Sequence, residues 1–473
     1  MKISSHAVAR MLGSWQEGAG PAHQRLSDRL RLLILDGRLS LGAALPSERD
    51  LAAALGTSRT TVGAAYRTLV DHGYLATRAR ARATVRLPDD PPPERRAGAA
   101  PSTINPSFAA PPTIDLSFAA PPAPNEILHA AFATALERLP RHFARHGYDR
   151  YGTAELRAAV ADWYGRRGLP TRPDHVLITN GAQHALALLA RTLLSPRDKV
   201  LIDHPTYPHA IRAFTDVRAR LLPVAVTPSG WDAAQLRAAG RAAHLAYLIP
   251  DFHNPTGLCM SASVRRGLKL ACPTVVDETM TDLALDGTEP EPFALHAPAA
   301  ISVGSVSKSI WGGLRIGWIR AAPAVLERVE QARSATDLGT PVVEQLATAV
   351  LLDQRQTRRP DALDRLRAQR DALRQAVAAH LPDVDAPEPP GGLTVWAAFP
   401  EPVSSRLAAL APDHGVTIAA GPRFGVGGAF ERYVRLPYTL PEEQLTRAVR
   451  GLARARQALV EGATGRHTPA PVA

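Results

Sequence analysis

The stretch Ile301-Ser-Val-Gly-Ser-Val-Ser-Lys-Ser-Ile-Trp-Gly-Gly-Leu-Arg-Ile-Gly-Trp318 carries the clearest indication of fold and chemistry in this 473-residue chain. Lys308 follows an apolar run that is typical of a buried strand end, and Ser305, Ser307 and Arg315 lie near it in sequence. A primary amine beside hydroxyls and a guanidinium suits an aldehyde cofactor that also carries a phosphate. The amine would form a Schiff base, and the other three residues would hold the phosphate. A surface lysine in a Ser/Gly loop is the alternative, which this stretch alone does not exclude.

Apolar runs alternate with helical patterns throughout residues 114–473. The runs that indicate buried strands are Val176–Thr179, Val200–Ile202, Leu245–Ile249, Thr274–Val276 and Ile301–Val303. This alternation predicts an α/β domain with a largely parallel sheet and helices on both faces. Ligands of such sheets collect at the carboxyl ends of the strands, so the residues that follow each run are candidates for a binding site.

Three strand ends offer a phosphate loop, an aromatic ring and an amide. Gly181, Ala182 and Gln183 open a helix after the first run, and backbone N–H groups at a helix start suit a phosphate. Tyr207 follows the second run and can stack on a flat heterocycle. Asn254, in a His-Asn-Pro-Thr-Gly turn, can donate to a phenolic oxygen. Each has a structural alternative, because Tyr207 can be a core aromatic and Asn254 can simply build the turn.

Two further candidates are a carboxylate and an arginine. Asp277 ends the Thr274–Val276 run and can keep a pyridine nitrogen protonated, while Arg435 can bind the carboxylate of a substrate or effector. Alone, Asp277 can equally cap a helix, and Arg435 can be a surface charge. The joint order of all these residues along the chain, with Lys308 between Asp277 and Arg435, favours one shared site over separate structural roles.

This order resembles that of the fold-type I aminotransferases, and the resemblance spans about Asp115 to Arg456. It implies the α/β fold of the pyridoxal-phosphate-dependent transferases, with a small C-terminal α+β subdomain, and pyridoxal 5′-phosphate as cofactor. The resemblance implies that five residues contact the phosphate, namely Ala182, Gln183, Ser305, Ser307 and Arg315. It also implies that Tyr207 stacks on the ring, Asn254 bonds O3′, Asp277 bonds N1 and Lys308 forms the internal aldimine.

Two positions depart from the pattern of that family. Tyr148 or Tyr151 resembles the segment that reaches the neighbouring subunit's cofactor, but the spacing leaves open which of the two serves. Three residues after the carboxylate the family commonly has a tyrosine that bonds O3′, and here Met280 stands there. Loss of this donor should alter the pKa and reactivity of the lysine, which argues against efficient transamination.

Residues 1–88 have the pattern of a helix-turn-helix. Residues 26–36 carry an apolar helical face, and a short helix is expected from the cap Ser47 to Leu55, ended by Gly56. A further helix after Ser58 places four residues on one buried face, namely Val62, Ala65, Tyr66 and Leu69. Two short helices joined by a three-residue turn that contains glycine predict a DNA-binding unit whose second helix enters the major groove.

The outward face of that second helix and the segment after it are basic. The residues left to face outward are Ser58, Arg59, Thr60, Gly63 and Arg67. Arg78, Arg80 and Arg82 alternate with alanine and would share one face of a strand, which suits phosphates or a minor groove. Residues 1–88 contain 13 Lys and Arg against 6 Asp and Glu, so most of the net charge of +11 lies here. A solvated basic face is the alternative.

This segment resembles the GntR family of winged-helix regulators over about residues 22–87. The motifs that carry the resemblance are Leu45-Pro-Ser-Glu-Arg49, Ser58-Arg-Thr-Thr-Val62, Tyr66 and Gly73-Tyr-Leu75. The residues implied to contact double-stranded DNA are Ser47, Arg49, Ser58, Arg59, Thr60, Thr61, Arg67, Arg78, Arg80 and Arg82. Arg80-Ala-Arg82 replaces the usual Gly-x-Gly turn at the wing tip, which leaves the shape of the wing open but not its charge.

Residues 89–113 form a Pro- and Ala-rich tract without periodicity, which predicts a linker between a DNA-binding domain (1–88) and a body (114–473). No run of about 18 apolar residues and no signal-peptide pattern occurs in the sequence. Cys259 and Cys272 have no metal-binding spacing and are too few for a disulfide framework. We therefore expect a cytoplasmic protein with neither a membrane segment nor a metal site.

Taken together, the two halves resemble the MocR subfamily of GntR-type transcriptional regulators over nearly the whole chain. The resemblance implies a head-to-tail homodimer in which each DNA-binding domain packs on the other subunit's body. It also implies a regulator that binds pyridoxal phosphate and a double-stranded DNA operator. Our hypothesis for its mechanism is that a small amino-compound effector acts at Lys308, with Arg435 on its carboxylate, and thereby shifts DNA binding. Two alternatives stay open: an active aminotransferase with a DNA-binding appendage, and a sensor of pyridoxal phosphate itself.

Overall fold

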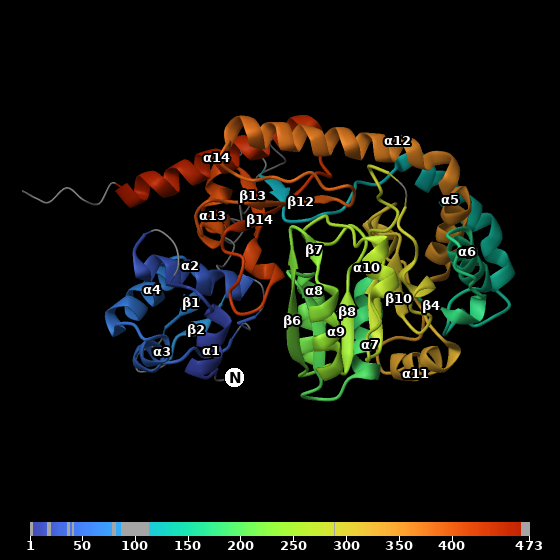
Figure 1. The fold of residues 1–473 in the computed structure, drawn as a ribbon, viewed down its shortest axis with the longest axis horizontal. Coiled ribbons are helices and arrows are strands. Elements are labelled where there is room, and N and C mark those ends of the chain that lie inside the picture. The colour runs from blue at the N-terminus through green and yellow to red at the C-terminus, as the bar shows by residue number, and fades with distance from the viewer. Residues whose placement is uncertain are drawn as a thin grey trace, which may run out of the picture.

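The structure is a computed structural model that describes residues 3–16, 20–35, 38–39, 42–77, 82–86, 113–287 and 289–464. In Figure 1 an N-terminal helical domain (blue) lies beside a small α+β domain (mainly red and orange), and a large α/β domain occupies the centre. Residues 89–112 of the predicted linker lie outside the described residues. None of the described helices is both long and apolar enough to cross a bilayer.

The N-terminal domain has the predicted helix-turn-helix followed by a two-stranded wing base. Its elements are α1 (Ser5–Leu12), α2 (Ala22–Leu35), α3 (Glu48–Leu55), α4 (Arg59–Asp71), β1 (Leu75–Ala76) and β2 (Thr84–Val85). Ser47 starts α3 by accepting a hydrogen bond from the Asp50 amide, and Gly56 ends it in the left-handed conformation. Ser58 starts α4 by accepting a hydrogen bond from the Thr61 amide. The two caps therefore set the short helices where the sequence predicts them.

One residue of α4 lies differently from the prediction. Gly63, expected on the outward face, is buried. A Cβ at this position would lie 3.2 Å from Oε1 of Glu48 on α3. The close approach of α3 and α4 therefore places Gly63 between the helices, and the outward face of α4 is narrower than the sequence suggests.

The large domain is built on an eight-stranded sheet with the order β4-β11-β10-β9-β8-β5-β6-β7. The strands are β4 (Val176–Thr179), β5 (Lys199–His204), β6 (Arg220–Thr227), β7 (Gly230–Trp231), β8 (Leu245–Leu248), β9 (Thr274–Asp277), β10 (Ile301–Ser305) and β11 (Gly317–Arg320). The neighbours from β10 through β9, β8 and β5 to β6 are parallel, as predicted. β11, which the sequence analysis did not identify as a strand, lies antiparallel between β10 and β4.

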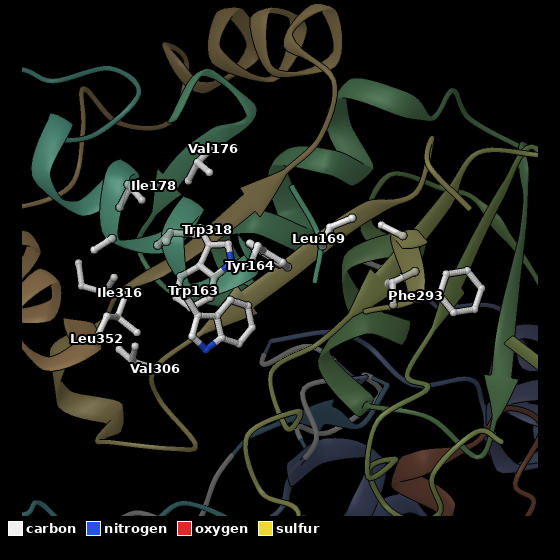
Figure 2. Packing of buried hydrophobic residues seen from close by; sticks show 14 of the residues in the cluster. Trp163, Tyr164, Leu169, Val176, Ile178, Phe293, Val306, Ile316, Trp318 and Leu352 are labelled. Atoms are coloured by element: carbon white, nitrogen blue, oxygen red, sulfur yellow. Dashed lines mark hydrogen bonds between the residues drawn. The ribbon is translucent and has the colours of Figure 1, made fainter. Parts of the chain in front are cut away.

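Helices cover both faces of this sheet because its strands are apolar on both sides. The helical segments of the domain are α5 (Asn125–Arg138), η2 (Leu139–His142), α6 (Ala154–Arg166), η3 (Pro173–His175), α7 (Ala182–Leu193), α8 (Pro208–Asp216), α9 (Ala233–Ala242), α10 (Ala262–Gly267), η4 (Phe293–Leu295), η5 (Gly312–Leu314) and α11 (Pro323–Arg333). Leu177 packs with α7, α8 and α11, whereas Val176 and Ile178 pack on the opposite face with α5 and α6. Figure 2 shows the core on the face of Val176 and Ile178, in which Trp163, Tyr164 and Trp318 lie together.

The small domain surrounds a four-stranded sheet with the order β12-β14-β13-β3. Its elements are β3 (Ile114–Leu116), β12 (Thr394–Ala398), α13 (Ser404–Leu410), η6 (Ala411–His414), β13 (Val416–Ala420), η7 (Gly421–Phe424), β14 (Tyr433–Pro437) and α14 (Glu442–Thr464). The long helix α12 (Val342–His380) contacts α5 and α6 of the large domain and α14 of the small one. It runs across the top of both domains in Figure 1 and therefore joins them.

Candidate cofactor and DNA-binding sites

Lys308 lies in the turn that follows β10, at the carboxyl end of the strand. Its Nζ donates a hydrogen bond to the Ala119 carbonyl at 2.6 Å. Burial lowers the pKa of Lys308 to about 8, with Arg435 acting in the same direction and Asp277 opposing it. A lysine with this pKa is a far better nucleophile at neutral pH than an ordinary surface lysine, because more of it is uncharged.

Asp277 ends β9, the strand next to β10, and is buried with both carboxylate oxygens occupied. Thr279 donates to Oδ1 from its hydroxyl (2.6 Å) and its amide (3.0 Å). Tyr247 donates from its hydroxyl to Oδ2 at 2.7 Å. Burial raises the pKa of Asp277, and the donors from Thr279 and Tyr247 lower it. The carboxylate is thus held in a fixed orientation at the centre of the sheet edge.

Tyr247 and Thr279 are site residues that sequence reasoning missed. Tyr247 lies on β8 with Val275 as its partner in register, which brings its ring close to the end of β9. A tyrosine within a strand that is otherwise apolar was the available signal, because a buried hydroxyl nearly always has a hydrogen-bond partner.

The start of α7 and the turn after β10 face each other. Gly181 precedes α7 with a φ of +82°, and a Cβ there would lie 2.9 Å from the Arg315 guanidinium. Arg315 also donates to the Asn180 carbonyl at 3.1 Å. The structure therefore places a guanidinium beside the free amides of a helix start, which is an arrangement that binds phosphate.

The serine hydroxyls near Lys308 are engaged locally. Ser305 donates to the Ile316 carbonyl at 2.8 Å, and its oxygen lies 2.8 Å from the Ser307 hydroxyl. Ser305 therefore shapes the turn that carries Ser307 and Lys308, in addition to the phosphate role expected from the sequence. Ser309 is different, since its hydroxyl is buried and has no hydrogen-bond partner within the described residues.

Tyr207 and Asn254 approach the site from two other strand ends. Burial raises the pKa of Tyr207 to about 12, and the charge of Asp277 acts in the same direction. Asn254 is 7% exposed, and its amide oxygen has no hydrogen-bond partner among the residues that the structure describes. The side chain of Gln183 donates to the His209 carbonyl at 3.3 Å, while Ala182 begins α7.

Arg435 enters the site from β14 of the small domain. It is 6% exposed, its guanidinium lies 5.0 Å from the centroid of the Phe424 ring, and it donates to the Ser117 carbonyl. Burial lowers the pKa of Arg435 to about 10, and the charge of Arg423 acts in the same direction. A desolvated guanidinium held against a ring is well suited to bind a carboxylate in one orientation.

The residues present fit a flat, anionic, phosphorylated ligand. The Ser309 hydroxyl and the Nε of Arg435, which both can donate a hydrogen bond, are buried without partners in the described part of the chain. Two cations, Lys308 of the large domain and Arg435 of the small domain, are desolvated in this site. Buried polar atoms are costly unless a ligand or water satisfies them, so this set indicates a binding site.

The two candidate tyrosines of the intersubunit segment lie in different environments. Tyr148, in the segment after η2, is 58% exposed. Tyr151 packs against the core formed with α7 and α11, and its carbonyl accepts a hydrogen bond from the Ile178 amide at 2.9 Å. The ring of Tyr148 is therefore available to a second molecule, whereas that of Tyr151 is partly committed to its own chain.

The candidate DNA-binding residues gather on α3, α4 and the wing. Arg49, Arg59, Thr60 and Arg67 are exposed, Thr61 is partly exposed, and the hydroxyls of Ser47 and Ser58 serve as helix caps. Arg59 pairs with Glu48 at 3.2 Å, and Arg82 pairs with Asp50 at 3.6 Å. Arg78 and Arg80 lie outside the described residues. The described arginines form an exposed basic face that is partly neutralised by α3.

Comparison with known proteins finds relatives of both halves. A family described as aminotransferase class I and II matches residues 113–452, and one described as bacterial regulatory proteins, gntR family, matches residues 22–85. The HTH-type transcriptional regulator YisV of Bacillus subtilis is 26% identical over 90% of this chain and 95% of its own length. The probable rhizopine catabolism regulatory protein MocR of Rhizobium meliloti is 30% identical over 71% of this chain and 72% of its own.

A solved structure shares the fold of the body. It is LysN, the alpha-aminoadipate aminotransferase of Thermus thermophilus, in complex with N-(5′-phosphopyridoxyl)-L-leucine. The match has a TM-score of 0.66 at 30% identity and covers 74% of this chain and 93% of that one.

Proposed function

Because this chain belongs to the aminotransferase class I and II family and also carries a gntR-family domain, we propose that it is a transcriptional regulator that senses a small amino compound. MocR-type regulators have this same combination of domains. The amino compound would bind at Lys308 in a body that holds pyridoxal 5′-phosphate, and the winged helix would bind double-stranded DNA. The observation that carries the proposal is that Arg435 of the small domain faces the sheet edge that bears Lys308 and Asp277, in a chain that also has an exposed helix-turn-helix.

The cofactor, when bound, supplies an aldehyde carbon that reacts with primary amines. Lys308 is the amine of this chain with the position and the lowered pKa to react there. Asp277, oriented by Tyr247 and Thr279, would keep a proton on the ring nitrogen. Arg315 and the start of α7 would bind the phosphate.

An effector with an amine and a carboxylate would use both desolvated cations of the site. Its amine would replace the Lys308 amine at the cofactor, and its carboxylate would bind Arg435. Such a ligand changes DNA binding only if it binds two conformations of the protein with different affinity. Arg435 lies on the small domain and Lys308 on the large one, so a ligand that bridges them favours a closed arrangement of the two.

Replacement of the lysine tests this proposal. Lys308→Ala, loaded with pyridoxal phosphate, should lose the response of DNA binding to amino acids while the winged helix still binds DNA. The measurement is the affinity for a duplex from upstream of the protein's own coding sequence, with and without a panel of L-amino acids that includes leucine and 2-aminoadipate. A variant that responds as the wild type does would contradict the proposal.

A catalytically active aminotransferase is the second candidate. Arg435 and Asn254, which a substrate and its cofactor would use, are buried at the site and support this reading. Met280 opposes it, because its side chain is 2% exposed, packs in the small-domain core and cannot donate a hydrogen bond. A half-reaction separates the two: rapid conversion of the loaded protein to the pyridoxamine form with an amino acid would favour the enzyme.

We also propose that the protein is a homodimer. The body exposes several large apolar side chains. Leu136 lies on α5, Phe143 and Tyr148 lie in the segment after η2, and Leu338 lies just before α12. Such exposure on an α/β body favours burial against a second copy. In this structure the winged helix contacts the small domain of its own chain, and a head-to-tail dimer would make the same contact between subunits. Light scattering would measure the mass, and a monomer at micromolar concentration would contradict the dimer.

A further inference from the structure

We propose that residues 424–431, here named the coupling segment, carry the state of the amino-compound site to the winged helix. This inference rests on the proposed function. The segment connects η7 to β14 and has one end in the site and the other against the N-terminal domain. In Figure 1 this part of the small domain lies between the central sheet and the N-terminal domain in blue.

The first end of the coupling segment belongs to the candidate site. Phe424 is 1% exposed, and its ring lies 5.0 Å from the guanidinium carbon of Arg435. The Phe424 carbonyl accepts a hydrogen bond from the Thr206 amide at 2.7 Å, directly before Tyr207. A ligand that moves Arg435 therefore acts on Phe424 through a direct contact, and one that moves Tyr207 acts on it through the neighbouring Thr206 amide.

The middle of the segment is fixed to the end of β5. His204 accepts a hydrogen bond from the Val426 amide at 3.0 Å, and its ring lies 4.6 Å from the ring of Phe430. A Cβ at Gly425 would lie 2.6 Å from the Phe430 ring and 2.9 Å from the His204 ring nitrogen. The turn is too closely packed to absorb a displacement at one end, so movement at Phe424 is passed on to residues 427–431.

The far end of the segment meets the winged helix at a backbone-to-backbone contact. A Cβ at Gly13, which ends α1, would lie 1.7 Å from the Gly427 carbonyl oxygen. A Cβ at Gly428 would lie 2.8 Å from both the Arg29 guanidinium and the Leu12 carbonyl. Glycine is needed on both sides of this contact, since any side chain would push the two domains apart.

A buried ion pair fixes the same contact. Arg29 of α2 donates to Glu431 at 2.9 Å and to the Ser405 hydroxyl at 3.1 Å, and its Nε donates to the Leu12 carbonyl at 3.2 Å. The side chains of Arg29 and Glu431 are 4% and 11% exposed. Glu431 also accepts from the Ser405 amide and hydroxyl. A buried charge without its partner is strongly unfavourable, so the position of Glu431 determines where α2 can sit.

Charge reversal of this pair provides the test, with full-length protein loaded with pyridoxal phosphate. The variants are Arg29→Glu, Glu431→Arg and the double variant, and Arg172→Glu is the control because Arg172 forms an exposed pair with Asp174 on the body. The probes are L-leucine and L-2-aminoadipate. Visible absorbance reports amine binding at the body, and the affinity for the upstream DNA duplex reports the winged helix.

We expect the amino acids to shift DNA affinity about 5- to 150-fold in the wild type and in Arg172→Glu, the usual range of coupling between sites. Each single reversal should bind the amino acids as the wild type does in the absorbance titration, but the amino acids should then change its DNA affinity by about twofold or less. The double variant should recover at least half of the wild-type change in DNA affinity, measured on a logarithmic scale. Glu431→Gln is the second variant, because it keeps the shape of the side chain if a reversal prevents folding, and it should weaken the shift.

Two outcomes would overturn the inference, and they are distinguishable. If the wild type binds the amino acids by absorbance and its DNA affinity does not change, the proposed function fails and the coupling segment fails with it. If the wild type responds and the folded single variants respond equally, the sensor stands and the route through residues 424–431 is wrong.

Discussion

The winged helix and the body hold their positive charges in opposite ways. On the winged helix, the side chains of Arg59 and Arg82 are 75% and 43% exposed and pair with carboxylates of α3. In the body, Lys308 and Arg435 are desolvated and donate to backbone carbonyls, and burial lowers the pKa of both. One set of charges faces solvent, and the other is desolvated inside the body.

This difference indicates two kinds of anion recognition in one chain. Exposed arginines attract an extended polyanion over a long range and lose that attraction as salt rises. Desolvated cations are screened little by salt and bind only an anion that fits their geometry, because an imperfect partner leaves them unsatisfied. The body is therefore expected to be selective and the winged helix strongly dependent on salt.

The largest expected effect is the loss of the buried guanidinium. Arg435→Gln should weaken the binding of L-leucine to the loaded protein by about 2 to 4 kcal/mol, or roughly 30- to 1000-fold, because the carboxylate loses its desolvated partner. The measurement is a visible absorbance titration. 3-Methylbutylamine, which is leucine without its carboxylate, is the matched control ligand and should bind both proteins alike. An equal loss for the two ligands would contradict the assigned role.

The pH dependence of cofactor capture comes next. The pKa of Lys308 is lowered to about 8, so its uncharged fraction falls about tenfold per pH unit below that value and changes little above it. The rate at which cofactor-free protein binds pyridoxal phosphate should follow the same curve between about pH 6 and pH 9. A rate that still rises tenfold per unit above pH 9 would indicate an ordinary lysine.

A smaller effect is expected from one exposed arginine. Arg59→Ala should weaken DNA binding by about tenfold and reduce the slope of log affinity against log salt by about one, the amount expected for one phosphate contact. Arg172→Ala removes an exposed arginine from the body and is the control. The absorbance titration with amino acids should be unchanged in both variants. An unchanged salt slope for Arg59→Ala would remove this residue from the DNA interface.

The smallest effect should come from the tyrosine that orients Asp277. Tyr247→Phe removes one hydrogen bond to a buried carboxylate and should weaken cofactor binding by about 1 kcal/mol, or roughly fivefold. Tyr164→Phe is the matched control, because Tyr164 donates to Glu278 at 2.8 Å on the other face of the sheet. Both variants should lose thermal stability, but only Tyr247→Phe should lose cofactor affinity. Equal cofactor binding in the two would contradict the role of Tyr247.

Much of the winged helix follows from local sequence. Ser47 and Ser58 are short polar side chains that satisfy the first amides of the helices they start, and Gly56 adopts the left-handed conformation that ends α3. These interactions span only a few residues, so they are visible in the sequence. The burial of Gly63 and the pairing of Arg82 with Asp50 were not predicted, because both depend on how closely separate elements pack.

In the body, the sequence indicated which strand ends matter but not how they are joined. Apolar runs predicted β4, β5, β8, β9 and β10, and a parallel sheet brings their carboxyl ends to one edge. The strand β11 was not predicted, since a short antiparallel strand between β10 and β4 has no periodicity of its own. The contacts of Lys308 and Arg435 with residues 117–119 were not predicted either, because those residues lie far away in the chain.

The types of residue at each strand end, the helix caps and the joining of a winged helix to an α/β body can all be recognised in the sequence. Those properties depend on side-chain chemistry and on hydrogen bonds between near neighbours. The folded structure was needed to find that Tyr247 and Thr279 hold Asp277, that burial lowers the pKa of Lys308, and that Glu431 pairs with Arg29. Desolvation and long-range contact depend on which surfaces pack together, and that packing is a property of the whole fold.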